Sequence, residues 1–165
     1  MSENPSASPS TPSSSWLPRS RRSPGEARRV LERLLADTPG GERFLDTGRL
    51  LVTELVTNAV LHGTPIGRRI RLVLHVDRWR LRIEVHDARG ERGPVFRAAS
   101  GEDESGRGIL LVKLLARQWG CCPRDGVGKI VWAEVAPVPA DPGVDSAPGP
   151  IPGSTPIPGP GERAA

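Results

Sequence analysis

Tyrosine is absent from this sequence, and cysteine and lysine are scarce. Its 165 residues include no tyrosine and only two cysteines, Cys121 and Cys122, which are neighbours. Adjacent cysteines rarely form an ordinary disulfide, and two ligands do not make a zinc site. The sequence therefore excludes a disulfide-stapled scaffold and a zinc module, and we expect a reducing, cytoplasmic location.

Long apolar runs are missing as well. A membrane-spanning helix needs about 18 consecutive apolar residues, and no stretch of the sequence approaches that length. The N-terminus is too polar for a secretory signal. We therefore expect no association with a membrane.

Positive charge comes almost entirely from arginine, because Lys113 and Lys129 are the only lysines. The formal net charge is +4 and the sequence pI is about 10.0. A nucleic-acid surface usually combines a basic stripe with stacking aromatic side chains. Here aromatics make up 4% of the chain and the arginines are scattered. A GC-rich coding sequence also explains the arginine bias, so direct binding of nucleic acid is disfavoured.

Composition divides the chain into three parts. Residues 1–15 are rich in Ser and Pro, and residues 137–165 are rich in Pro and Gly. Neither segment has enough apolar surface to offset the entropy of ordering, so both are predicted to be disordered. The C-terminal segment is a solvated extension or, less favoured, a polyproline docking segment. Residues 16–136 then form one domain within the usual range of about 100–150 residues.

Apolar periodicity predicts three helices. The first is expected to start at Ser23, which would cap it in a capping box with Glu26, while Pro24 suits the first helical position. It is expected to end before the Pro/Gly breaker at 37–41. A second helix is expected over about 42–61 and a third over about 106–120, followed by a turn of sequence CCPRDGVG.

Alternating apolar residues predict the strands. Residues 70–76 and 79–86 form an antiparallel hairpin with Trp79 on its apolar side and a tight Asp77-Arg78 turn. Further strands are expected over 129–135 and, at an edge, around 15–19. The predicted fold class is therefore α+β, a two-layer sandwich with helices packed on one face of a mainly antiparallel sheet.

The stretch TELVTNAVLHG, residues 53–63, carries a polar stripe on an otherwise apolar helix. Glu54, Asn58 and His62 follow at four-residue spacing, which places them on one side. Such a stripe is usually the wet side of an amphipathic helix. However, Asn, His and the flanking threonines are weak helix formers, unlike the residues that solvent faces favour. Since the rest of the helix is apolar, the stripe fits a ligand-facing wall equally well.

Two more features follow along the chain. Asp87 ends an apolar strand before a Gly-rich, acidic loop at 88–105, which is long enough for a lid. Ser105-Gly106-Arg107-Gly108 then opens a helix, where free N–H groups favour phosphate oxygens. Taken singly, each feature is often only a turn. Together they supply the parts of a nucleotide site. The Asn58 side-chain oxygen is a suitable ligand for Mg²⁺, and the Glu54 carboxylate one turn away can act as a general base. A buried Asp87 can accept a hydrogen bond from an amino group.

The order and spacing of these motifs resemble the GHKL ATPase superfamily, the histidine-kinase-like ATPase domains with a Bergerat-type ATP-binding fold. TELVTNAVLHG resembles its N box, VHDARG its first glycine-associated box and SGRGILLV its second. The resemblance covers about residues 16–136. The residues of these motifs most resemble those of stand-alone bacterial anti-sigma factor serine/threonine kinases of the RsbW type.

The resemblance implies a role for each matching residue. Glu54 would be the catalytic general base, Asn58 the ligand of Mg²⁺, and Asp87 the acceptor for the adenine amino group of ATP. The loop at 88–105 would be the ATP lid. The implied contacts to the phosphates come from the start of the third helix, at Gly106, Arg107 and Gly108.

Two positions depart from the family pattern. The first box usually reads Asp-x-Gly, whereas the glycine of Asp87-Ala88-Arg89-Gly90 comes one residue later. The last strand usually begins with a Thr that supports the adenine contact, and the matching position is assigned to Ile130, which neither donates nor accepts. His62 receives no catalytic role and is expected to pack or cap.

The resemblance implies a regulatory protein and leaves three functions open. The first is an anti-sigma factor that binds ATP and Mg²⁺, phosphorylates a Ser or Thr of an anti-anti-sigma (STAS-type) partner and sequesters a sigma factor. The second is a non-catalytic module that holds a protein partner, with or without ATP. A detached histidine-kinase catalytic domain is third, since no segment here supplies a phospho-acceptor helix pair. A homodimer through the first strand and helix is also implied.

Overall fold

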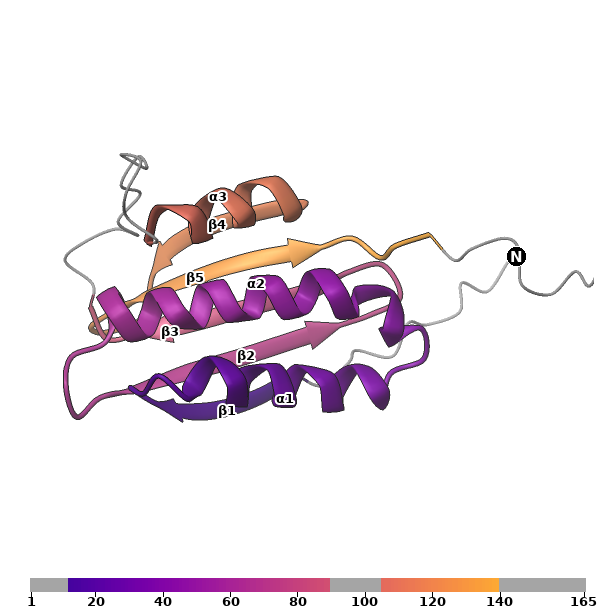
Figure 1. Cartoon of the computed structure of the whole chain (residues 1–165). Coiled ribbons are helices and arrows are strands. Elements are labelled where there is room, and N and C mark those ends of the chain that lie inside the picture. Colours follow the sequence, from indigo (N-terminus) through magenta and orange to yellow (C-terminus); the bar gives the residue numbers. More distant parts are fainter. Residues whose placement is uncertain (1–11, 90–104, 140–165) are drawn as a thin grey trace, which may run out of the picture.

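The structure is a computed structural model that describes residues 12–89 and 105–139. Figure 1 shows the three α-helices lying over one face of a sheet. The helical elements are α1 (Ser23–Ala36), η1 (Gly41–Phe44), α2 (Leu45–Asn58), η2 (Ala59–Gly63) and α3 (Ser105–Leu115). The strands are β1 (Ser13–Pro18), β2 (Arg69–Val76), β3 (Leu81–Asp87), β4 (Gln118–Pro123) and β5 (Lys129–Val135). Within the described ranges, no helix combines the length and the apolar character needed to cross a membrane.

The sheet has five strands in the order β1-β2-β3-β5-β4, and every neighbouring pair is antiparallel. The predicted fold class, an α+β sandwich with helices on one face of an antiparallel sheet, is confirmed. β1 begins at Ser13, so the paired strand extends into the segment 1–15 that composition had placed outside the domain. Strand pairing needs backbone groups rather than apolar side chains, which is why composition gave no sign of it.

Period-two alternation gives the sheet its buried face. In β3 the residues Leu81, Ile83 and Val85 are buried, while the residues between them are partly exposed. The core joins this row to apolar residues of β2, α1 and α2, among them Ile70, Leu72, Leu74, Ala27, Leu31, Leu35, Leu51, Val52, Leu55 and Val56. Each large side chain buried in this way contributes about 1.5–3 kcal/mol. Asp87 is the next member of the same β3 row, so the alternation itself carries a carboxylate to the helix-covered face.

Charged side chains cover the helix-free face of the sheet. Arg82 is their centre: its guanidinium bonds Glu84 at 2.7 Å and Glu134 at 3.1 Å. The same guanidinium lies over the ring of Trp132, 4.1 Å from its centroid. This network gives the second face of β3 and β5 a polar surface, while the first face packs under the helices.

The third helix is shorter than predicted, and its expected last turn is a strand. α3 ends at Leu115, and Gln118–Pro123 forms β4, which pairs with β5. The Gly, Cys and Pro content of this stretch indicated a turn, but an edge strand tolerates both Gly and Pro. Gly120 is also needed in β4 because a Cβ there would collide with the Trp132 ring.

Two further local predictions are wrong. Ser23 does not cap α1; its hydroxyl donates a 2.5 Å hydrogen bond to the Pro18 carbonyl and ties β1 to the helix start. The β2–β3 turn is also longer than expected, because Asp77 Oδ1 accepts from the N–H groups of Trp79 and Arg80. This Asx turn delays β3 to Leu81 and leaves the Trp79 side chain 69% exposed instead of buried.

We expect Leu51→Ala to lower the free energy of unfolding by about 2–5 kcal/mol, because Leu51 is fully buried between α2 and the sheet. The matched control is Leu50→Ala, since Leu50 is its neighbour in α2 but 49% exposed. Urea denaturation of both variants measures the difference. Equal losses for the two would contradict the burial of this face of α2.

Candidate functional site

A buried ion pair lies at one end of the sheet, beneath the helices. The antiparallel register of β3 and β5 places Asp87 opposite Lys129. Lys129 Nζ lies 2.9 Å from Asp87 Oδ2, and the two side chains are only 8% and 2% exposed. Ions this far from water are retained only with good geometry and further hydrogen bonds.

Those further hydrogen bonds come from the chain just after β3. The N–H of Arg89 donates to Asp87 Oδ1 at 3.0 Å and to the Gly63 carbonyl at 3.1 Å. Lys129 Nζ also donates to the Arg89 carbonyl at 3.2 Å. The result is a closed set of contacts that joins the end of β3, the start of β5 and the last residue of η2.

Two glycines allow this close packing. A Cβ on Gly63 would collide with the Asp87 carboxylate, and a Cβ on Gly128 would collide with the Asp87 carbonyl. Gly128 also has a φ of 126°, which L residues with a side chain rarely adopt. Burial raises the pKa of Asp87, while the Lys129 ammonium and the Arg89 N–H act in the opposite direction.

The position beside Asp87 was assigned wrongly from the sequence. Ile130 pairs with His86, one residue away from the Asp87–Lys129 pair, so its side chain lies on the helix-free face. Lys129 instead belongs to the buried row of β5 with Val131 and Ala133. The register depends on the turn at 124–128, where Arg124 N–H bonds the Gly128 carbonyl, and the sequence pattern did not define that length.

Glu54 and Asn58 lie on one side of α2, as predicted from their spacing. Both are half-buried, and neither side chain has a hydrogen-bond partner within the part of the chain that the structure describes. Glu54 reaches the first turn of α3, because a Cβ on Gly108 would collide with its carboxylate oxygen. Burial raises the pKa of Glu54, which favours its neutral form relative to an exposed glutamate.

His62 does not continue this side of the helix. Residues Ala59–Gly63 form the π-helical turn η2, so the four-residue spacing no longer keeps side chains in line. The His62 side chain is exposed, so it does not pack as expected, and it makes no capping hydrogen bond within the described residues. Leu61, in the same turn, is 52% exposed. The His62 carbonyl accepts a 3.4 Å bond from the Arg89 guanidinium. π-Turns within helices are frequent at functional sites.

The continuous segment α2–η2 therefore contacts both halves of the predicted site: Gly108 through Glu54, and Asp87 through Gly63. Gly106 lies in the first turn of α3, as does Arg107, whose side chain lies outside the described residues. The predicted lid also lies outside them, except for Ala88, Arg89 and Ser105. Sequence reasoning missed Lys129 and also Thr64, whose Oγ1 is buried without a partner in the described part of the chain.

An α+β sandwich with an acid–amide pair on one helix, a glycine at the start of the next and a buried aspartate at a strand end defines a nucleotide-binding type of protein. The chain belongs to the histidine kinase-like ATPase domain family, whose model matches residues 17–134. No curated protein sequence matches the chain.

The donor set is compatible with the ligands that this family implies. Asn58 carries an amide oxygen of the kind that Mg²⁺ accepts, and Mg²⁺ needs only one or two protein ligands when phosphates and water complete its shell. The described residues hold no cluster of three or more His, Cys, Asp or Glu side chains that could hold a metal ion. The absence of a Cβ at Gly108 allows the Glu54 carboxylate to approach the first turn of α3 closely.

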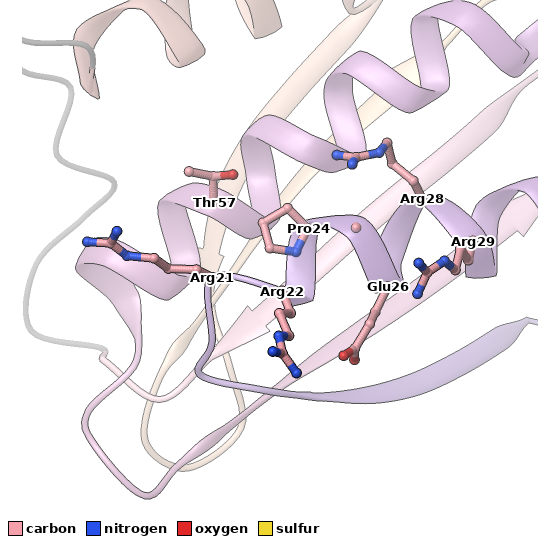
Figure 2. A pocket seen from close by; sticks show the side chains of 8 residues that line it. Arg21, Arg22, Pro24, Glu26, Arg28, Arg29 and Thr57 are labelled. Carbon is pink, nitrogen blue, oxygen red and sulfur yellow. The ribbon is translucent and has the colours of Figure 1, made fainter.

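A separate, open pocket of about 720 Å³ lies at the start of α1, bordered on α2 by Thr57. Figure 2 shows the arginines of this pocket extending from the start of α1. Its charged lining residues are Arg21, Arg22, Glu26, Arg28 and Arg29. Arg28 donates to Thr53 of α2 at 3.1 Å, so this pocket and the Glu54–Asn58 pair share one helix. Four arginines against one glutamate make the pocket attractive to an anion.

We expect Glu54→Gln to raise the thermal unfolding midpoint at neutral pH. The raised pKa of Glu54 means that its contribution to stability is full below its ordinary value of 4.5 and is lost as the pH rises through the folded-state value. Glutamine cannot ionise, so the variant avoids that loss, and the two midpoints converge in acid. Thermal unfolding over a pH series measures this, and a variant that is less stable at neutral pH would contradict it.

We expect Lys129→Met to lower the free energy of unfolding by about 3–5 kcal/mol at neutral pH, because it leaves the Asp87 carboxylate buried without its counter-charge. The loss should shrink in acid, where Asp87 is protonated. The double variant Asp87→Leu, Lys129→Met should be more stable than Lys129→Met alone. Denaturant titration of the three proteins tests this, and additive losses would rule out the ion pair.

Proposed function

We propose that this protein is an ATP-binding anti-sigma factor that transfers a phosphoryl group to a Ser or Thr of an anti-anti-sigma (STAS-type) partner and sequesters a sigma factor. Membership of the histidine kinase-like ATPase domain family supports ATP binding. The single observation that carries the catalytic part is the Glu54 carboxylate, held against the first turn of α3 and one helical turn from Asn58.

Phosphoryl transfer needs positioning and electrostatics more than covalent chemistry. Glu54 is half-buried and its pKa is raised, and a base whose pKa is moved toward the working pH accepts a hydroxyl proton more effectively. Asn58, on the same side of α2, offers its amide oxygen to Mg²⁺. A bound Mg²⁺ would supply neutralisation of phosphate charge. The first turn of α3 would offer backbone N–H groups to the phosphates.

A protein partner is supported by the arginine-lined pocket at the start of α1. An anionic group of a partner that bound there would lie against Thr57, next to Asn58 in α2. Complementary charge of this kind increases association rates and specificity. The partner is therefore proposed to present an acidic segment to this pocket.

The second candidate is a non-catalytic module that holds a regulatory partner. This candidate is favoured by the Asp87–Lys129 ion pair. The Asp87 carboxylate, which would accept a hydrogen bond from adenine, already has a buried counter-ion. In this case the arginine-lined pocket would bind the partner and Glu54 would have no chemical role.

We expect calorimetry to detect Mg²⁺-dependent ATP binding that Asn58→Ala weakens at least tenfold, since a ligand-bearing oxygen is lost. Glu54→Gln should keep binding within a few-fold, yet reduce phosphate transfer from labelled ATP to the partner by about 100-fold or more. Binding without transfer by the unaltered chain would favour the non-catalytic module. No binding at millimolar ATP would refute ATP dependence altogether.

A further inference from the structure

The open pocket at the start of α1 gathers positive charge. Its volume of about 720 Å³ lies within the range of small-molecule sites, which is about 300–1,000 Å³. Figure 2 shows its four arginines, Arg21, Arg22, Arg28 and Arg29. Within the described residues, none of the four forms an ion pair with an acidic side chain. Guanidinium groups that gather in this way favour an anionic ligand.

The charge of the pocket sets the charge of the ligand that fits it. Among the lining residues Glu26 alone is acidic, so four guanidiniums against one carboxylate leave an excess of three positive charges. A phosphate group carries about 1.5 to 2 negative charges at neutral pH. Two phosphate groups therefore balance the excess, whereas a single one does not.

The start of α1 adds a backbone donor to the same pocket. Arg22 stands at the N-cap position without a capping side-chain hydrogen bond, and the Ser23 hydroxyl bonds the Pro18 carbonyl instead. Gly25 lines the pocket, and its N–H has no hydrogen-bond partner within the part of the chain that the structure describes. A phosphate group has three acceptor oxygens for such an N–H and for guanidiniums together, while a carboxylate has two.

We propose that this pocket binds a small ligand with two neighbouring phosphate groups, such as a diphosphate, at a site separate from the nucleotide site between α2 and α3. The guanidiniums hold the phosphate oxygens, because their planar forks match phosphate geometry. The Gly25 N–H donates to one of these oxygens and so gains the partner that it lacks within the described residues.

The position of the pocket makes this ligand a regulator of the proposed function. Thr57, at the border of the pocket, precedes Asn58 in α2, and Arg28 donates to Thr53, which precedes Glu54. The ligand would also occupy the place proposed for the acidic segment of the partner, so the two would compete. This regulatory consequence rests on the proposed function, whereas binding of the ligand itself does not.

The test is calorimetry of the unaltered chain with inorganic pyrophosphate as the probe, in the absence of Mg²⁺ and ATP. Citrate, a carboxylate anion of about the same charge, is the matched control ligand. We expect pyrophosphate to bind with a Kd below about 1 mM and about tenfold or more tightly than citrate. Equal binding of the two anions would overturn the inference, because the pocket would then respond to charge alone. Absence of pyrophosphate binding would overturn it as well.

Three variants assign the binding to the pocket. The double variant Arg21→Gln, Arg29→Gln should weaken pyrophosphate binding about tenfold, because two guanidiniums are lost. Glu26→Gln should tighten it, because the acidic group of the lining is removed. Arg117→Gln, the matched control, removes an exposed arginine outside the pocket and should change nothing. Pyrophosphate binding that is unchanged in the double variant would overturn the inference.

A measurement on the unaltered chain keeps the inference testable if a variant fails to fold. In an NMR titration with pyrophosphate, the amide signal of Gly25 should shift, whereas that of Gly120 in β4 should not. A shift confined to Gly106 and Gly108 would place the anion at the start of α3 and overturn the inference. Neither titration contains ATP or a partner. A chain that binds pyrophosphate but no ATP would therefore contradict only the proposed function, and the reverse result would contradict only this inference.

Discussion

The architecture of the site depends on one buried electrostatic contact, the ion pair between Lys129 and Asp87. It joins the end of one central strand to the start of the next, and through Arg89 it fixes where the chain leaves the sheet. The cost of burying both charges is offset only because each has further hydrogen-bond partners in a fixed geometry. Glycine at 63 and at 128 fits this arrangement, since a Cβ at 63 would collide with the Asp87 carboxylate and one at 128 with the Asp87 carbonyl.

The helices make a second, more adaptable half of the site. α2 runs on into η2, so one continuous segment contacts α3 through Glu54 and the sheet through Gly63. Burial raises the pKa of the half-buried Glu54 carboxylate, so this charge costs stability when it is ionised.

Much of this arrangement could be predicted from periodicity, and the failures have definite physical causes. The two-residue repeat of a strand places Asp87 on the buried face, and the 3.6-residue repeat of a helix places Glu54 beside Asn58. Both repeats hold wherever the strand or helix is regular. The rule failed at His62, where a π-turn changes the helical repeat. Periodicity also could not predict that Lys129 lies opposite Asp87. The register between β3 and β5 depends on the geometry of the turn at 124–128 rather than on any pattern within β5. β4 was missed because composition alone does not separate an edge strand from a turn.

The charged face of the sheet has a consequence for how this chain meets other molecules. Arg82, Glu84 and Glu134 already satisfy one another there, and Trp132 is covered by the Arg82 guanidinium. A second sheet that packed on that face would desolvate these charges without offering them new hydrogen-bond partners. The charged face therefore disfavours sheet-on-sheet packing.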